Sequence, residues 1–315
     1  MQTIEDKIKQ KAKNSGVDLV GITTAEPVSA VYIKHFKKWL ADGCCGKMAW
    51  LTKNIDKRFN AVLLLPDAQS VICTALDYKP AKTVLRPAVK IASYALYQDY
   101  HSFIKKRLCE LAEFIKGQTG KGLKFKICVD SVPMAEKALA ERAGLGFIGK
   151  NYLLTNPKLG SFLLLGELIT NLPLKIDKPT PKKEFCKNCT RCIDACPTGA
   201  ISKSLFFDSR KCISYLTIEH KGKIPIELKS KMDSCVFGCD RCILACPYNK
   251  KAPVCRNIDF KFFAERLNLL PKQILKFSQK DFDSLFADSP VNRTGLQRLK
   301  KNALICVKNA VLKPT

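Results

Sequence analysis

Long apolar segments are missing from this sequence. No stretch of about 18 uncharged apolar residues occurs, so a membrane-spanning helix is not expected. The first residues, MQTIEDKIKQKAKNSG, are charged and lack the apolar centre of a secretory leader. The sequence therefore predicts a cytoplasmic protein with no membrane partner.

Acidic residues are scarce. Asp and Glu number 28 against 54 Lys and Arg, which gives a formal net charge of +26. A lysine-rich genome would raise the lysine count, but it would not explain why so few acids balance the excess. A surface with this charge attracts polyanions. Nucleic acid is favoured over a membrane surface, because the basic residues are spread widely and no strongly amphipathic lipid-binding helix stands out.

Nucleotide-binding motifs are also missing. There is no P-loop, and the glycine-rich stretch AGLGFIGKN at 143–151 follows a helix pattern with a spacing that differs from G-x-G-x-x-G. The segment DYHSFI at 99–104 departs from the D-x-H-x-x-G signature that places a histidine on cobalt in some cobalamin proteins, because Ile104 replaces the glycine. Asp99 is expected to begin a helix instead. The residues alone leave open which second cofactor the chain binds.

Cysteine, in contrast, is abundant, with 16 residues. Because a leader is lacking, metal binding is expected rather than disulfides. Residues 186–197, CKNCTRCIDACP, form the C-x2-C-x2-C-x3-C-P run of ferredoxins, whose last cysteine binds the other cluster, and residues 239–247, CDRCILACP, repeat its second half. The pattern assigns Cys186, Cys189, Cys192 and Cys246 to cluster 1, and Cys196, Cys239 and Cys242 to cluster 2.

The spacing leaves the fourth ligand of cluster 2 open. A complete second motif would place it at residue 236, which is Val. Cys235 is one residue out of register and Cys212 lies in the intervening segment RKCISYL, so the two are equally favoured. A zinc site is disfavoured, because the fused C-x3-C-P ending is not a zinc-ribbon spacing. The array predicts two [4Fe–4S] clusters that move single electrons.

The remaining chain predicts a fold of mixed α/β and α+β class. Residues 1–172 alternate strand and helix patterns, as in a layered α/β domain. Strands are predicted at 17–24, 70–78, 90–97, 123–129 and 161–169, and helices at 4–15, 33–41, 99–117 and 133–143. Residues 173–184, rich in Pro and Lys, read as a linker to a ferredoxin-like domain at 185–250. Residues 251–315 carry 13 Lys and Arg against 5 Asp and Glu, a net charge of +8, and predict helices at 258–267, 271–286 and 294–311.

Asp130 has two interpretations. It follows the strand pattern LKFKICV and precedes SVPMAEKALAER, so it could cap a helix whose early turn holds Pro133. Alternatively, it is a proton donor at the carboxyl end of a strand, where ligands gather in α/β sheets. Pattern alone favours capping.

Taken together, several segments resemble the epoxyqueuosine reductases, cobalamin-dependent iron–sulfur enzymes that complete queuosine at the wobble position of tRNA. The resemblance covers nearly the whole chain. Besides the two cysteine motifs, it is carried by VDLVGITTAEP, NIDKR with LLPDAQSVI, QDYH, VDSVPMAEKALAERAGLGFIGKN, TNPKLGSFLLLGE and RKCISYLTIE. It implies an N-terminal domain similar to nitroreductase and flavin-reductase folds, followed by a two-cluster ferredoxin-like domain and a short helical region.

The resemblance also implies roles for individual residues. Asp130 matches the family's proton donor, and Cys212 matches the fourth ligand of cluster 2. Cobalamin, held base-off, would be contacted by Arg58, Ala92, Asp130, Leu154, Leu165, Ser214, Cys239 and Asp240. Arg293 and Arg298, in NRTGLQRLKKNA, match a tRNA-facing region. The chain departs from the family's frequent CPWN with Cys246-Pro247-Tyr248-Asn249, and its helical tail is short.

The implied reaction is reduction of epoxyqueuosine to queuosine in tRNA. An external low-potential donor would reduce cluster 1, and electrons would pass through cluster 2 to cobalt. Burial is expected to keep Asp130 protonated for proton transfer. Two other readings are a reductive dehalogenase, which would act on small organohalides and gain nothing from a +26 surface, and a ferredoxin-type electron carrier, which would need no cobalamin.

Overall fold

A four-stranded sheet forms the centre of the N-terminal part. The computed structural model describes residues 2–81, 89–120, 122–181, 185–204 and 206–311. The sheet has the order β1-β2-β7-β4 and every neighbouring pair is antiparallel. Its strands are β1 (Leu19–Thr24), β2 (Ser70–Asp77), β4 (Phe125–Cys128) and β7 (Leu163–Thr170). The predicted strands at 17–24, 70–78, 123–129 and 161–169 are confirmed. Their antiparallel pairing makes this part α+β, which the alternation of strands and helices along the chain did not specify.

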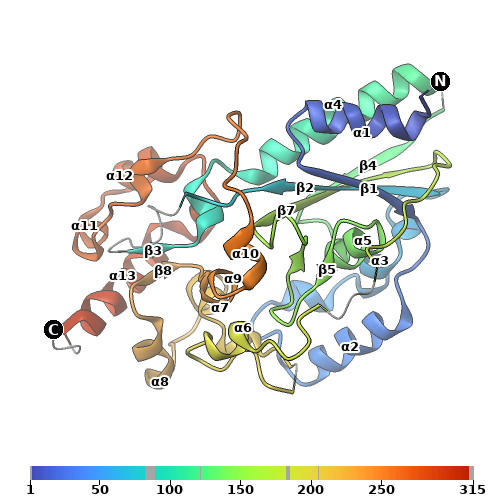
Figure 1. The fold of residues 1–315 in the computed structure, drawn as a ribbon. Helices are drawn as coiled ribbons and strands as arrows, with labels where there is room; N and C mark the ends of the chain where they lie inside the picture. Colours follow the sequence, from blue (N-terminus) through green and yellow to red (C-terminus); the bar gives the residue numbers. More distant parts are fainter. Residues whose placement is uncertain (1, 82–88, 121, 182–184, 205, 312–315) are drawn as a thin grey trace.

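The two faces of the sheet pack against different elements. β2 is buried at every position, so its side chains enter both cores in alternation. Ile72 packs on the face covered by α1 (Ile4–Asn14) and α4 (Tyr100–Thr119), whereas Val71 and Cys73 face α5 (Glu136–Arg142). Figure 1 shows α1 and α4 above the sheet and α5 below it.

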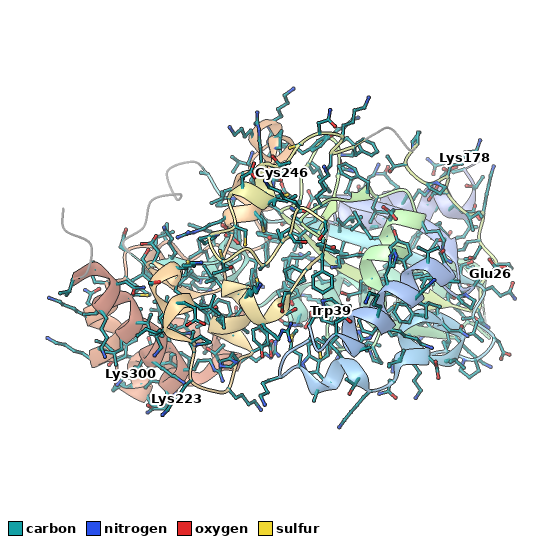
Figure 2. All side chains as sticks on the ribbon, turned by 90° about the horizontal axis from the view of Figure 1, so that it is seen from below. Glu26, Trp39, Lys178, Lys223, Cys246 and Lys300 are labelled. Atoms are coloured by element: carbon teal, nitrogen blue, oxygen red, sulfur yellow. The ribbon has the colours of Figure 1, made fainter. Side chains whose placement is uncertain are left out.

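The cysteine-rich segment, residues 185–251, contains several short helices. They are α6 (Arg191–Asp194), α7 (Ile213–Ile218), α8 (Ile226–Lys229), α9 (Arg241–Leu244) and α10 (Pro247–Lys251). β8 (Cys235–Phe237) joins this segment to the N-terminal part, because it pairs in parallel with β3 (Lys90–Ile91). On the other side, the Trp39 indole of α2 (Ala30–Ala41) donates to the Phe207 carbonyl at 2.7 Å. Figure 2 shows Trp39 between these parts of the molecule.

Two predicted elements are wrong. The expected strand at 90–97 is a strand only at β3, and Ser93–Leu96 forms a 3-10 helix. The expected helix at 258–267 is helical only at Ala264–Arg266. In both places the apolar side chains are held by tertiary packing, for example Tyr97 stacked on Phe260 with ring centroids 4.8 Å apart, and local periodicity does not report such contacts.

The basic C-terminal region packs against β8. The predicted 271–286 helix is divided into α11 (Pro271–Lys276) and α12 (Gln279–Phe286), and α13 (Gly295–Val311) follows. The buried Asn302 amide of α13 donates to the carbonyls of Thr217 and Val236, both at 2.9 Å. In the described ranges, no helix is long and apolar enough to cross a bilayer.

Among the cations that the structure describes, Arg266 is the most deeply buried, with 1% of its surface exposed. Its guanidinium donates to four backbone carbonyls, those of Ala95, Tyr97, Leu285 and Asp288. These bonds join the C-terminal helices to the segment that follows β3. A planar fork of five donors satisfies this arrangement, whereas a lysine ammonium would not.

We expect Arg266→Lys to lower the free energy of unfolding by about 2–3 kcal/mol, because charged donors to buried carbonyls are lost. Urea denaturation followed by circular dichroism measures this change. Arg256→Lys, at an exposed position, is the matched control and should stay within about 0.5 kcal/mol of the wild type. Equal stability of the two variants would contradict the role given to Arg266.

Candidate functional site

Four of the predicted ligands surround one cavity. Cys186, Cys189, Cys192 and Cys246 line a space of about 520 Å³ together with Phe147 and Tyr248. Cys186 has a positive φ of 63°, and Cys246 is the residue before α10. The Lys150 ammonium donates to the carbonyls of Lys187, at 2.7 Å, and Cys189, at 3.1 Å, and so holds the cysteine loop against the cavity. The dimensions and the soft donors of this site suit an iron–sulfur cluster.

The other predicted ligands form a second group. Burial raises the pKa of Cys242, and the nearby thiols of Cys212, Cys239 and Cys196 raise it further. Cys212 lies directly before α7 and its pKa is raised to about 11, first by burial and then by Cys239 and Cys196. The structure thus brings Cys212 together with the three cysteines that spacing left one ligand short.

Cys235, the other candidate, has a different position. It lies on β8 and is 1% exposed. A hydrogen bond with the Cys239 sulfur is the largest cause of its raised pKa, and the same bond lowers the pKa of Cys239 to about 7. Cys235 therefore contacts Cys239, one cysteine of the second group.

Asp130 lies in a tight turn after β4. Its φ is 52°, in the left-handed region that few non-glycine residues adopt. Its backbone N–H donates to Glu136 Oε1 at 2.7 Å, and its carboxylate Oδ2 lies 3.2 Å from His101 Nε2. It does not cap α5, whose preceding residue is Ala135. The conformation is the kind of local strain that clusters at functional sites.

His101 connects Asp130 to the start of α4. Asp99 caps this helix by accepting the His101 backbone N–H at 2.9 Å, as predicted, and the same carboxylate oxygen lies 2.6 Å from His101 Nδ1. His101 was not predicted as a site residue, because its segment was compared only with a cobalt-binding signature that it does not match.

The proton of this group lies on His101 at neutral pH. Burial alone would lower the pKa of His101, but its bonds to Asp130 and Asp99 outweigh this effect and raise the pKa to about 9. The His101 hydrogen bond lowers the pKa of Asp130, more than burial raises it. The expectation that burial keeps Asp130 protonated is therefore wrong, because a cationic neighbour dominates.

Besides Asp130, the predicted cobalamin contacts lie in three places. Arg58, on α3 (Ile55–Phe59), lies over Phe36 and Trp50, and its buried Nε has no hydrogen-bond partner among the described residues. Leu154 and Leu165 belong to the α5 side of the sheet. Ala92, Cys239 and Asp240 lie at the β3–β8 junction, where the buried Asp240 carboxylate accepts the Ser93 N–H and hydroxyl, both at 2.7 Å. Ser214 lies on α7, two residues after Cys212.

Arg293 and Arg298 lie together at the start of α13. Arg293 pairs with Glu219 at 2.7 Å, and Arg298 donates to the His220 carbonyl. Arg298 also lines a cavity of about 320 Å³ with His220, Thr294 and Lys301. Both arginines are thus placed beside the loop that follows α7.

Comparison with known proteins shows the family to which the chain belongs. Residues 185–249 match the family described as a 4Fe-4S double cluster binding domain, and residues 58–131 match epoxyqueuosine reductase QueG, DUF1730. An epoxyqueuosine reductase from Leadbetterella byssophila is 40% identical over 303 residues, 96% of this chain and 98% of its own. One from Francisella cf. novicida is 39% identical, covering 93% of this chain and 84% of its own. The chain belongs to the epoxyqueuosine reductase family.

Solved epoxyqueuosine reductases have the same fold. The enzyme from Streptococcus thermophilus superposes with a TM-score of 0.87 at 31% identity, over 98% of this chain and 82% of its own. A reductase solved with an epoxyqueuosine-modified tRNA-Tyr stem loop gives a TM-score of 0.85 at 31% identity, over 97% of this chain and 81% of its own. This member of the epoxyqueuosine reductases is thus an oxidoreductase with a double-cluster domain.

The pairing of His101 with Asp130 has a consequence for stability. Because the pKa of His101 is raised from 6.5 to about 9, the stability from its protonated form is fully present below about pH 6.5 and is lost as the pH rises through about 9. We expect His101→Gln to be more destabilised at pH 6 than at pH 10, as measured by urea denaturation. His35→Gln, on α2, is the matched control. An equal effect of His101→Gln at both pH values would contradict the assigned proton.

Proposed function

We propose that this chain reduces epoxyqueuosine to queuosine in tRNA, with two [4Fe–4S] clusters, cobalamin and Asp130. The observation that carries the proposal is the arrangement of the cysteines. Two groups of four thiols and a strained aspartate meet within one fold that matches a reductase solved with its modified tRNA stem loop. The net reaction consumes two electrons and two protons, breaks both C–O bonds of the epoxide and releases its oxygen as water.

Each thiol group would hold one cluster. Cluster 1 would be bound by Cys186, Cys189, Cys192 and Cys246, and cluster 2 by Cys196, Cys212, Cys239 and Cys242. Cluster 1 would accept electrons from the external low-potential donor, because its cavity opens beside the exposed Lys187 and Lys251. The interdigitated ligand sets, in which Cys196 and Cys246 each serve the other motif's cluster, hold the two clusters close enough for electron transfer.

The two candidates for the last ligand can be separated. We expect Cys212→Ser to lose a cluster, so that bound iron falls from about eight to about four atoms per chain. Cys235→Ser is the matched control and should keep about eight, because Cys235 contacts only the ligand Cys239 in this proposal. Colorimetric iron and sulfide assays on anaerobically purified protein measure both. Loss of iron in Cys235→Ser alone would reverse the assignment.

Cobalamin would lie between the α5 side of the sheet and the β3–β8 junction with α7. Contacts are proposed for Arg58, Ala92, Asp130, Leu154, Leu165, Ser214, Cys239 and Asp240. The structure supports a polar ligand here, because the buried Arg58 Nε has no hydrogen-bond partner in the part of the chain that the structure describes, and it would bind an acceptor such as a corrin amide. When bound, the cofactor supplies the low-potential reducing centre, and the protein positions and protonates the substrate.

Asp130 would deliver the proton to the epoxide oxygen. At neutral pH the proton lies on His101, 3.2 Å away, and the carboxylate is ionised. As a C–O bond breaks, negative charge grows on the oxygen, and Asp130 passes on the proton that His101 supplies. The pair thus works as general acid with its proton stored on the imidazole, within hydrogen-bond reach.

Replacing Asp130 with Asn tests this assignment. The amide cannot transfer the proton, so we expect turnover of epoxyqueuosine tRNA to fall by about 10²–10⁴. The cluster absorption spectra should be unchanged, since the side chain holds neither cluster. Turnover is measured by nucleoside mass spectrometry on tRNA from a strain that accumulates epoxyqueuosine. Turnover at the wild-type rate would remove Asp130 from the mechanism.

The basic end of the molecule would bind the tRNA backbone. Lys223 and Lys300 lie at the same end in Figure 2, and a 2.9 Å bond from Lys301 to the Gly222 carbonyl places α13 beside this loop. Arg293 and Arg298 would contact phosphates from this face. The net charge of +26 provides the long-range attraction, and the wobble base would be unstacked to reach the site.

A further inference from the structure

A second acidic side chain, Glu167, lies behind the Asp130 turn with its carboxyl in an unusual environment. It is on β7, opposite Cys73 of β2 and Cys128 of β4, and none of its surface is exposed. Neither carboxyl oxygen has a hydrogen-bond partner in the described part of the chain. An ionised carboxylate in such a place is strongly unfavourable, so the group holds its proton at neutral pH.

Glu136 lies between this buried acid and Asp130. It is the first residue of α5, which packs on β7. Its Oε1 accepts the Asp130 N–H at 2.7 Å, directly at the residue with positive φ. Burial raises the pKa of Glu136 to about 7, and the charge on Asp130 adds to the shift. The Glu136 side chain therefore binds the backbone of the Asp130 turn, and it changes charge near neutral pH.

We propose that Glu136 is the positioning residue of the Asp130 turn and that its carboxylate stabilises the proton on His101, while Glu167 stays neutral behind it. This inference rests on the proposed function for its catalytic meaning, but the contacts stand without it. An ionised Glu136 accepts the Asp130 N–H more strongly than a neutral one, because the bond becomes charge-assisted. Because Asp130 contacts Glu136 through its N–H and His101 through its carboxylate, the negative charge of Glu136 lies close enough to favour the imidazolium form of His101.

Other charged and titratable groups face Glu136 from every element around it. They are Asp130 after β4, His101 and Tyr100 on α4, Lys137 on α5, Arg58 on α3, Cys73 on β2, Cys128 on β4 and Glu167 on β7. Lys137 lowers the pKa of Glu136, and its ammonium is held by the Tyr152 carbonyl at 2.7 Å. Glu136 and Glu167 provide a matched pair for the experiment below. Glu136 changes charge near pH 7, whereas Glu167 stays neutral.

Loop control has a parallel in the family. A solved Bacillus subtilis epoxyqueuosine reductase, 30% identical to this chain with a TM-score of 0.86, is described with its catalytic aspartate loop swung out of the active site. A bond from the Asp130 N–H to Glu136 is the contact in this chain that would keep such a loop in place. Glu136 would thereby hold the turn through a backbone group while leaving the Asp130 carboxylate for His101.

Histidine NMR tests the electrostatic half directly. The chain has only 3 histidines, so the His101 imidazole signals can be assigned by substitution in the intact, cluster-loaded protein. We expect Glu136→Gln to lower the pKa of His101 by about half a unit, the size of a screened interaction over several ångströms. Glu167→Gln is the matched control and should leave it unchanged, because it replaces a neutral acid by a neutral amide. An unchanged pKa in Glu136→Gln, or an equal shift in both variants, would overturn the proposal.

Hydrogen exchange tests the positioning half. Glu136→Ala removes the acceptor of the Asp130 N–H, so amide exchange in a peptide covering residues 129–135 should rise about five- to tenfold. Glu136→Gln keeps an acceptor oxygen but loses the charge, so its exchange should rise less than in Glu136→Ala, which also shows that the change in the Ala variant is not general unfolding. Unchanged exchange in Glu136→Ala would overturn the positioning role. Both readouts are independent of turnover, so a chain that failed to reduce epoxyqueuosine would refute the proposed function without deciding this one.

Discussion

The parallel pairing of β3 with β8 is the constraint on which the candidate site depends. It joins the N-terminal part of the chain to the cysteine-rich segment through bonds from Lys90 N–H to the Ser234 carbonyl, at 2.9 Å, and from Ala92 N–H to the Phe237 carbonyl, at 2.8 Å. Gly238, the residue after β8, lies so close to Ala92 that a Cβ on it would be 2.5 Å from the Ala92 Cβ. The pairing therefore fixes Cys239 and Asp240 against the residues that follow β3, and two segments nearly 150 residues apart share one site.

Basic residues predominate in the chain as a whole, whereas acidic residues gather around His101. The sequence carries a large positive excess, which suits a nucleic-acid substrate, whereas Asp99, Asp130 and Glu136 are grouped around one histidine and Glu167 is fully buried behind Glu136. Interior carboxyls are kept by a partner or by a proton. Here Asp130 and Asp99 have His101 as partner, and Glu167 keeps its proton. The result is a site that can hold a transferable proton at neutral pH.

Sequence alone predicted those parts that depend on local spacing. Ferredoxin-type motifs located seven of the eight proposed ligands, and Asp99 was expected to begin a helix, which it does. The choice between Cys212 and Cys235 required contacts across more than 20 residues, and the resemblance to a family favoured the same residue that the structure groups with Cys196 and Cys242. His101 was missed because its importance comes from Asp130, which is distant in sequence. Antiparallel pairing in the sheet was not predicted, because periodicity along a strand is the same for both pairings.

The most direct test of the account is conversion of the modified base itself. The cluster-loaded protein is incubated anaerobically with cobalamin, a low-potential reductant and tRNA that carries epoxyqueuosine, and the nucleosides are then analysed by mass spectrometry. The account predicts that epoxyqueuosine is replaced by queuosine, with loss of one oxygen atom, only when both cobalamin and reductant are present. Clusters that are fully reduced while epoxyqueuosine persists, or conversion that does not depend on cobalamin, would contradict it.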